Sequence, residues 1–135
     1  MRKTILAVLA GMVLFGCADK KAQEKALLDS VFKIHNKVMG ADERLMNSKM
    51  KLDTLLKQAG LPGKDTAAML SKKLEGAENA MGNWMRKFNG DSTGMSHEEK
   101  MVYLADQKKQ ITAIDSQINV AISESNKYIL KVKGK

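Results

Sequence analysis

The stretch that decides the fold is LSKKLEGAENAMGNWMRKF, residues 70–88. Its apolar residues recur at alternating steps of four and three: Leu70, Leu74, Ala77, Met81, Trp84 and Phe88. Residues three and four apart lie on the same side of an α-helix, so this spacing predicts a helix with one apolar stripe. Asp65 or Thr66 is the expected N-cap, and Asn89-Gly90 is a typical helix end. The stretch therefore predicts a helix over 66–88, with Trp84 as its largest core side chain.

The segments on either side have the same kind of spacing. A first helix is predicted over 22–58, with a bend at Gly40, because glycine in a helix interior costs about 1 kcal/mol relative to alanine. Its apolar positions form two adjacent rows on one broad face: Leu27, Val31, Ile34, Val38, Leu45 and Leu52, and Leu28, Phe32, His35, Met39, Met46 and Met50. A third helix is predicted over 97–131, and Ser96 and Glu99 form a capping box at its start.

The fold class predicted from these segments is all-α. The turn sequences Gly60-Leu61-Pro62-Gly63 and Asn89-Gly90-Asp91-Ser92-Thr93-Gly94 separate the helices. Short turns make neighbouring helices antiparallel, so we expect an antiparallel up-down-up three-helix bundle with coiled-coil character over 22–131. Because the middle helix is the shortest, one end of the bundle should consist of the outer two helices alone. Residues 132–135 are expected to form a basic tail.

The N-terminus predicts export and lipid attachment. Arg2 and Lys3 precede an apolar run of about eleven residues, which is shorter than the roughly 20 needed to span a bilayer. The run ends in Leu14-Phe15-Gly16-Cys17, which resembles the lipobox of bacterial lipoproteins. We therefore expect a lipoprotein signal peptide over 1–16 and a lipidated N-terminus with a short tether over 17–21. The alternative is an ordinary secretory signal followed by an unmodified cysteine.

The expected location follows from the lipid. Two or three acyl chains on Cys17 give stable membrane anchoring. Ala18, which follows the cysteine, favours the outer membrane, facing the periplasm or the surface, over the inner membrane. The single cysteine also excludes an intramolecular disulfide and a zinc site with several cysteines.

The charge indicates which partners to expect. The chain carries 23 basic and 15 acidic side chains, for a formal charge of +8. Removal of Arg2 and Lys3 with the signal peptide lowers this charge by two, and most of the remaining surplus lies in Lys127, Lys131, Lys133 and Lys135. An exported chain with 4% aromatic residues is not expected to bind nucleic acid. The expected partners are the membrane, through the lipid, and an envelope protein or an anionic polymer.

One set of side chains has the chemistry to bind a soft metal ion. Four of its members lie on one stripe of the first predicted helix and two on the second: His35, Met39, Met46, Met50, Met81 and Met85. Imidazole and thioether ligands suit Cu(I). Methionine at helical spacing is more often a core residue, because its flexible side chain fills irregular gaps. Core packing is therefore the favoured interpretation, and a periplasmic Cu(I)-binding protein is the alternative. No other cofactor is expected.

The sequence contains no arrangement typical of an enzyme. His97 is distant in sequence from His35, and the only thiol is expected to carry lipid. The acidic pairs Asp42-Glu43 and Glu98-Glu99 consist of adjacent residues, which diverge by about 100° around a helix and so cannot act on one substrate. Phosphate-binding and zinc-protease motifs are missing from the sequence. We therefore expect a structural or interaction module without catalytic activity.

Two motifs point to a known family. They are Val31-Phe32-Lys33-Ile34-His35-Asn36-Lys37-Val38-Met39 and Ala77-x-x-x-Met81-x-x-Trp84-Met85-x-x-Phe88. In these motifs, and over most of the chain after the signal peptide, the sequence resembles a group of small predicted lipoproteins of Bacteroidota, some of which are labelled viral A-type inclusion protein. The resemblance implies a helical envelope lipoprotein of unknown function and adds no chemistry.

Overall fold

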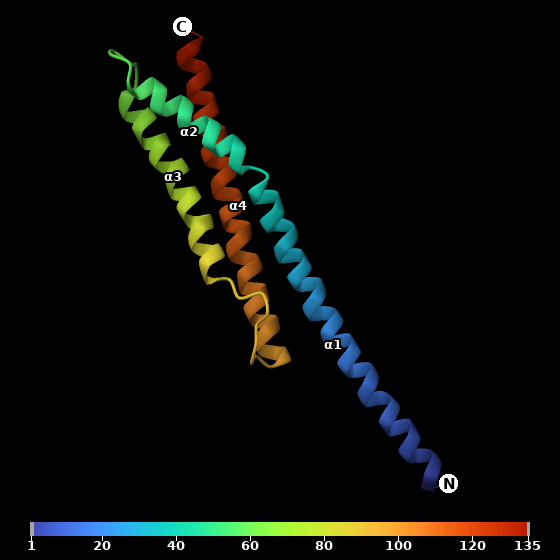
Figure 1. Ribbon diagram of the computed structural model, residues 1–135. Helices are drawn as coiled ribbons and strands as arrows, with labels where there is room; N and C mark the ends of the chain where they lie inside the picture. Colours follow the sequence, from blue (N-terminus) through green and yellow to red (C-terminus); the bar gives the residue numbers. More distant parts are fainter. Residues whose placement is uncertain (1, 135) are drawn as a thin grey trace.

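The computed structural model describes the backbone of residues 2–134 and the side chains of residues 19–134. It contains four helices, α1 (Arg2–Met39), α2 (Asp42–Leu56), α3 (Lys64–Lys87) and α4 (His97–Lys133). No β-strand occurs in residues 2–134, and the predicted all-α fold class is confirmed for this part of the chain. The helices α1 and α2 follow one another along one side of α4 (Figure 1).

The first predicted helix is divided at Gly40. The expectation of one helix over 22–58 is wrong, because α1 ends at Met39 and α2 begins at Asp42. Between them the N–H of Ala41 donates to the carbonyl of Val38 at 2.9 Å, and the N–H of Leu45 donates to the carbonyl of Ala41 at 3.0 Å. Ala41 has φ −90° and ψ −10°, close to helical values. The interruption is therefore short, and beyond it α2 turns away from the line of α1 toward α3 (Figure 1).

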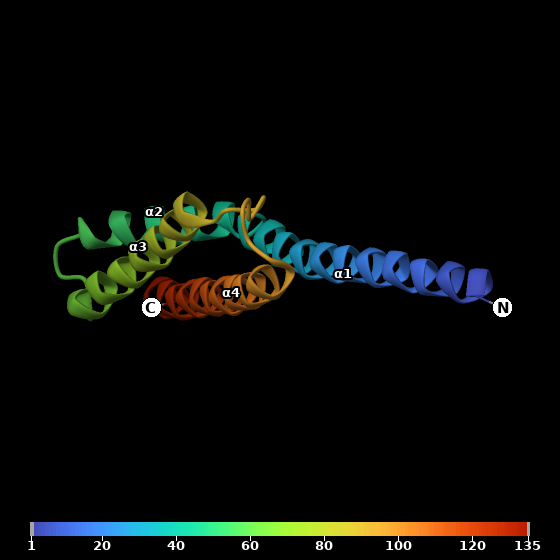
Figure 2. The same cartoon turned by 90° about the horizontal axis from the view of Figure 1, so that it is seen from below.

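A constant register joins this first arm to α4. Lys20 pairs with Glu98 at 3.2 Å, Lys37 with Asp115 at 2.7 Å, and Ser48 with Asn126 at 3.1 Å, and each pair is 78 residues apart in sequence. An offset that stays the same on both sides of Gly40 means that α1 and α2 run parallel to α4 in one register. As a result, the N- and C-termini lie at opposite ends of the molecule (Figures 1 and 2).

The helix α3 runs antiparallel to its neighbours. Lys49 and Asp53 of α2 contact Glu78 and Ser71 of α3, so the numbering falls in one helix as it rises in the other. Lys73 pairs with Glu124 of α4 at 2.7 Å. The up-down-up arrangement is thus confirmed. Because α3 ends at Lys87, the first turns of α4 have only α1 as a helical neighbour, which confirms the predicted two-helix end (Figure 1).

The core consists mainly of the predicted rows. Its buried apolar residues come from all four helices, the junction between α1 and α2, and the turn before α3: Val31, Val38, Ala41, Leu45, Leu52, Leu55, Leu61, Ala67, Leu70, Leu74, Ala77, Met81, Trp84, Leu104, Ile111, Ile114, Ile118, Ala121, Ile122 and Ile129. The second row predicted for the first helix is largely outside the core, since Phe32, Met39, Met46 and Met50 are exposed. The prediction of one broad apolar face on the first helix is therefore wrong. The helix α1 packs mainly against α4. A helix that packs against a single neighbour buries only one row of its side chains.

Two helix ends differ from the prediction. The N-cap of α3 is Gly63, in the left-handed conformation with φ 68°, rather than Asp65 or Thr66. Glycine adopts this conformation without steric cost, so the turn ends at Gly63 and the helix begins at Lys64. At the other end of the chain, α4 continues to Lys133, so the first two residues of the basic tail predicted over 132–135 belong to the helix. Val132 packs on the core and holds this last turn. The capping box of Ser96 and Glu99 is confirmed.

Candidate functional site

The predicted lipidation site lies next to the end of the bundle. The side chain of Cys17 and the predicted signal peptide, 1–16, are outside the residues whose side chains the structure describes. The backbone of α1 includes residue 17 and extends past the start of α4 in both views (Figures 1 and 2). Among residues 19–134, the first ion pair between α1 and α4 joins Lys20 to Glu98. Cys17 precedes Lys20 by three residues in the sequence.

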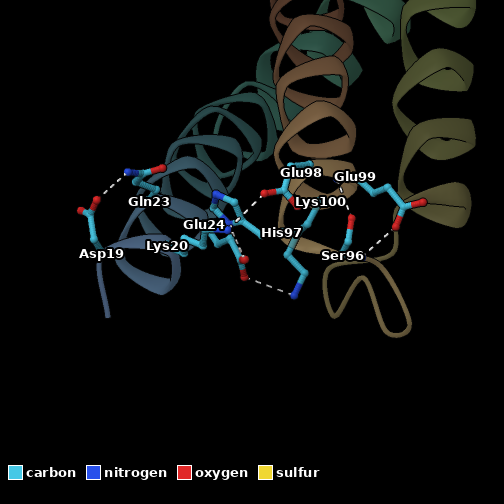
Figure 3. Close-up of polar contacts among 9 residues, drawn as sticks. All are labelled: Asp19, Lys20, Gln23, Glu24, Ser96, His97, Glu98, Glu99 and Lys100. Carbon is cyan, nitrogen blue, oxygen red and sulfur yellow. Dashed lines mark hydrogen bonds and ion pairs between the residues drawn. The ribbon is translucent and has the colours of Figure 1, made fainter. Parts of the chain in front are cut away.

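A cluster of charged side chains joins α1 to the start of α4. We call it the basal cluster, and it consists of Lys20, Glu24, His97, Glu98 and Lys100 (Figure 3). Glu24 is at its centre, with one carboxylate oxygen 2.8 Å from Nδ1 of His97 and the other 3.3 Å from Nζ of Lys100. These three side chains are between 18% and 25% exposed, whereas Lys20 and Glu98 are more than half exposed. The partly buried carboxylate thus has two donors from one helix turn of α4.

The carboxylates at this end have lowered pKa values. The hydrogen bond with His97 and the contact with Lys100 hold the pKa of Glu24 below its ordinary value. A backbone N–H at the start of α4 and the ammonium of Lys20 lower the pKa of Glu98. The backbone N–H and hydroxyl of Ser96 lower the pKa of Glu99. All three groups therefore favour the ionised form, in agreement with the positive end of a helix dipole.

These pKa values predict acid sensitivity. A carboxyl whose pKa is lowered in the folded state contributes its full stabilisation above the ordinary pKa, and loses it as the pH falls through the folded-state pKa. The free energy of unfolding should thus decrease as the pH drops below the ordinary glutamate value of 4.5. Glu24→Gln should lower stability at neutral pH and reduce the further loss in acid. Urea unfolding at both pH values measures this. Glu43→Gln, at an exposed position of α2, is the control. An identical pH profile for Glu24→Gln and the unsubstituted protein would contradict the role of Glu24.

Three of the residues predicted to bind a soft metal lie around one hollow. Met39, Met81 and Met85 line a space of about 290 Å³ between α1, α2 and α3, together with apolar side chains and two acidic ones, Asp42 and Glu78. Met81 is buried and forms its inner wall, whereas Met39 and Met85 are 42% and 43% exposed. The carboxylate of Glu78 is already paired with Lys49 at 2.9 Å, and this contact raises the pKa of Lys49. The three thioethers, which we call the thioether group, are therefore the candidate soft ligands that line this hollow.

The other predicted members of the set lie elsewhere. Met46 is exposed on α2, and Met50 lines a different hollow beside Lys133. The imidazole of His35 has its Nδ1 3.1 Å from the side-chain oxygen of Asn36, and its ring centre is 5.9 Å from that of Trp84. Core packing is thus confirmed for Met81 and wrong for Met39, Met46, Met50 and Met85. Met39, Met46 and Met50 fall on the second apolar row of the first predicted helix, and Met85 lies at an exposed position of α3.

The structure also contains a row of aromatic rings that the sequence analysis did not predict. Trp84 stacks on Phe88 with ring centres 4.7 Å apart, and Phe88 contacts both Phe32 of α1 and Tyr103 of α4. Tyr103 also accepts a hydrogen bond from the N–H of Asn89 at 2.8 Å. The row closes the end of the bundle where α3 stops. Only Trp84 and Phe88 could be recognised in the sequence, because their spacing belongs to the stripe of α3.

The part of the chain that the structure describes lacks two kinds of feature. It contains no group of three or more histidine, cysteine, aspartate or glutamate side chains placed to hold a metal ion. None of its helices combines the length and the apolar character needed to cross a membrane.

Comparison with protein families, with curated proteins and with solved structures finds no match to this chain. The resemblance to small lipoproteins of Bacteroidota therefore stays a prediction.

Proposed function

We propose that the protein is a lipid-anchored cell-envelope protein that acts as a structural or interaction module and has no catalytic activity. The observation that carries this proposal is the sequence Leu14-Phe15-Gly16-Cys17, which follows an apolar run and resembles a lipobox. Lys20, which pairs with Glu98 of α4, lies after the proposed cleavage point. Cleavage before Cys17 therefore retains this ion pair and residues 19–134, whose side chains the structure describes.

The arrangement of the helices supports an extended module. With lipid on Cys17, the membrane lies at the end that carries the basal cluster. The C-terminal lysines of α4, Lys127, Lys131 and Lys133, lie toward the opposite end (Figure 1). Cations there suit an anionic polymer or an acidic surface of an envelope protein. Ala18 favours the outer membrane, facing the periplasm or the surface, as the location.

The mass of the N-terminal peptide tests this proposal. The protein is isolated from the membrane fraction of cells that express the full chain, and its peptides are analysed by mass spectrometry. We expect the first peptide to begin at Cys17 and to carry two or three acyl chains. A peptide that begins at Met1, or an unmodified Cys17, would contradict the anchor.

A second candidate function is the binding of Cu(I) in the periplasm. The observation that favours it is the thioether group, since thioether ligands select Cu(I) over harder cations. Met81 and Met85 are four residues apart on α3 and so are neighbours on its surface, and Met39 approaches them from α1.

Titration of residues 18–135 with Cu(I), against a competing chelator, tests this second function. We expect one ion per chain, and loss of binding when Met39 and Met85 are both replaced by leucine, which keeps the side-chain volume. Met50→Leu is the matched control and should retain binding, because Met50 lies at a different hollow. Binding no tighter than that of free methionine would eliminate this function.

A further inference from the structure

A wide hollow lies on the outer side of α3 and α4. It has a volume of about 870 Å³ and is lined by residues of these two helices only. Met69 and Val120 project at its sides and are 50% and 52% exposed. Ala68 and Gly76 leave space between them, since a Cβ at Gly76 would meet only Gln117 within 4 Å. The hollow therefore has two exposed apolar side chains at its sides, and it leaves space for two further side chains from another molecule.

Charged residues continue the same two helix faces. On α3, Asp65 and Lys72 lie on one stripe with Met69 and Gly76, at steps of four, three and four. On α4, Lys127 and Lys131 follow Val120 by seven and eleven residues, and so lie on its side of the helix. In residues 19–134, Asp65, Lys72, Lys127 and Lys131 take part in no ion pair. This face thus offers unpaired charges of both signs.

We propose that this face docks a second copy of the chain, with α3 of each copy against α4 of the other and both N-termini at the same end. Contacts within one copy show which residues of α3 and α4 lie at the same height along the bundle axis. Tyr128 donates a hydrogen bond to the carbonyl of Pro62 at 2.9 Å, and Lys73 pairs with Glu124 at 2.7 Å. A two-fold axis parallel to the bundle places each residue of the second copy at the same height as in the first copy, so these pairings also hold between copies.

The resulting contacts are complementary in charge and shape. Asp65 falls between Lys127 and Lys131 of the second copy, and Lys72 falls beside its Glu124. Val120 of the second copy enters the space beside Met69 and Gly76. Each contact occurs twice, as a symmetric dimer requires, and the four helices form a bundle around the former hollow. An antiparallel dimer centred on the same hollow would instead bring Asp65 level with Gly76, where the nearest cation on that stripe, Lys72, is one helical turn away.

This inference gives the proposed interaction role a specific partner. It rests on that role but not on the lipid, because two copies that dock this way in solution have both N-termini at one end. Such a dimer also suits anchoring in one membrane, where confinement raises the effective concentration. The tests use residues 18–135, which contain every interhelical contact described. A negative result in these tests would not bear on the lipid anchor, and a negative result in the test of the anchor would not bear on the dimer.

Sedimentation equilibrium of residues 18–135 is the first test. We expect a monomer–dimer equilibrium between about 1 µM and 1 mM. Val120→Lys places a cation beside Lys72 of the second copy and should raise the dissociation constant by about tenfold or more. Val102→Lys is the matched control, since Val102 is 72% exposed on the same helix and lies outside the hollow. It should leave the dissociation constant unchanged. A monomer at every concentration, or equal effects of the two substitutions, would overturn the proposal.

Charge reversal tests the orientation. Asp65→Lys should weaken the dimer, and the added substitutions Lys127→Glu and Lys131→Glu should restore it. Circular dichroism confirms that each variant is folded. Failure of the triple variant to recover dimerisation, while Val120→Lys still dissociates the unsubstituted dimer, would overturn the parallel arrangement. A higher oligomer, or association only with an unrelated protein, would overturn the proposal as well.

Discussion

Replacing Cys17 with alanine should move the protein from the membrane fraction to the soluble periplasmic or unprocessed pool. The physical reason is that the thiol is the proposed attachment point for lipid, and stable anchoring takes two or three acyl chains. No helix in the described part of the chain is suited to span the membrane in their place. Fractionation of cells that express the full chain, followed by detection of the protein in each fraction, measures the effect.

Gly16→Ala is the control for this experiment. It retains a small residue before Cys17 and should keep the protein in the membrane fraction. If the Cys17→Ala variant stays bound to membranes and uncleaved, the apolar segment over 5–15 holds the protein itself, and the lipid anchor is wrong.

Replacing Trp84 with alanine should have the largest effect on the stability of the fold. The side chain is 5% exposed and stacks on Phe88 at the end of α3, with Phe32 and His35 of α1 nearby. Truncation of a buried tryptophan removes these contacts and leaves a cavity, which costs about 3–5 kcal/mol of unfolding free energy. Urea unfolding followed by circular dichroism measures the loss, since Trp84 is the only tryptophan and its fluorescence disappears with it.

Two further variants make this result specific. Trp84→Phe retains an aromatic ring and removes an indole N–H that is buried without a hydrogen-bond partner, so its loss should be smaller. Met85→Ala, at the adjacent exposed position, should cost less than about 1 kcal/mol. Equal losses for Trp84→Ala and Met85→Ala would show that the aromatic row does not stabilise the end of the bundle.

Much of the helix arrangement could be predicted because it depends on local patterns. The stripe of α3 and the capping box at Ser96 are set by residues close in sequence, and both agree with the structure. The width of the apolar face in the first arm depends on how many helices surround it. The sequence shows apolar residues at Met39, Met46 and Met50 but not whether a neighbour covers them, and none does.

The candidate sites were less predictable for the same reason. The basal cluster joins residues more than 70 positions apart, and nothing in the neighbourhood of Glu24 indicates that His97 faces it. The thioether group is half of a set that was predicted from two helices, with four members on the first and two on the second. In the structure Met39 shares a hollow with Met81 and Met85 of α3, whereas Met50 lines a different hollow and Met46 lines neither of the two. The sequence shows which residue types are present. Which of these residues come into contact depends on the register between the helices, which the sequence does not show.

The register of α1 and α2 with α4 has a mechanical consequence. Because these helices run parallel and the termini are at opposite ends, a pulling force between the N-terminus and the C-terminus acts along the helix axes in opposite directions. The two ion pairs and the hydrogen bond at an offset of 78 residues, together with the apolar contacts between them, then carry the load simultaneously in shear. A hairpin pulled from two adjacent ends would open one contact at a time. A bundle fixed at its N-terminus should therefore resist tension applied at its C-terminus far better than its small core suggests.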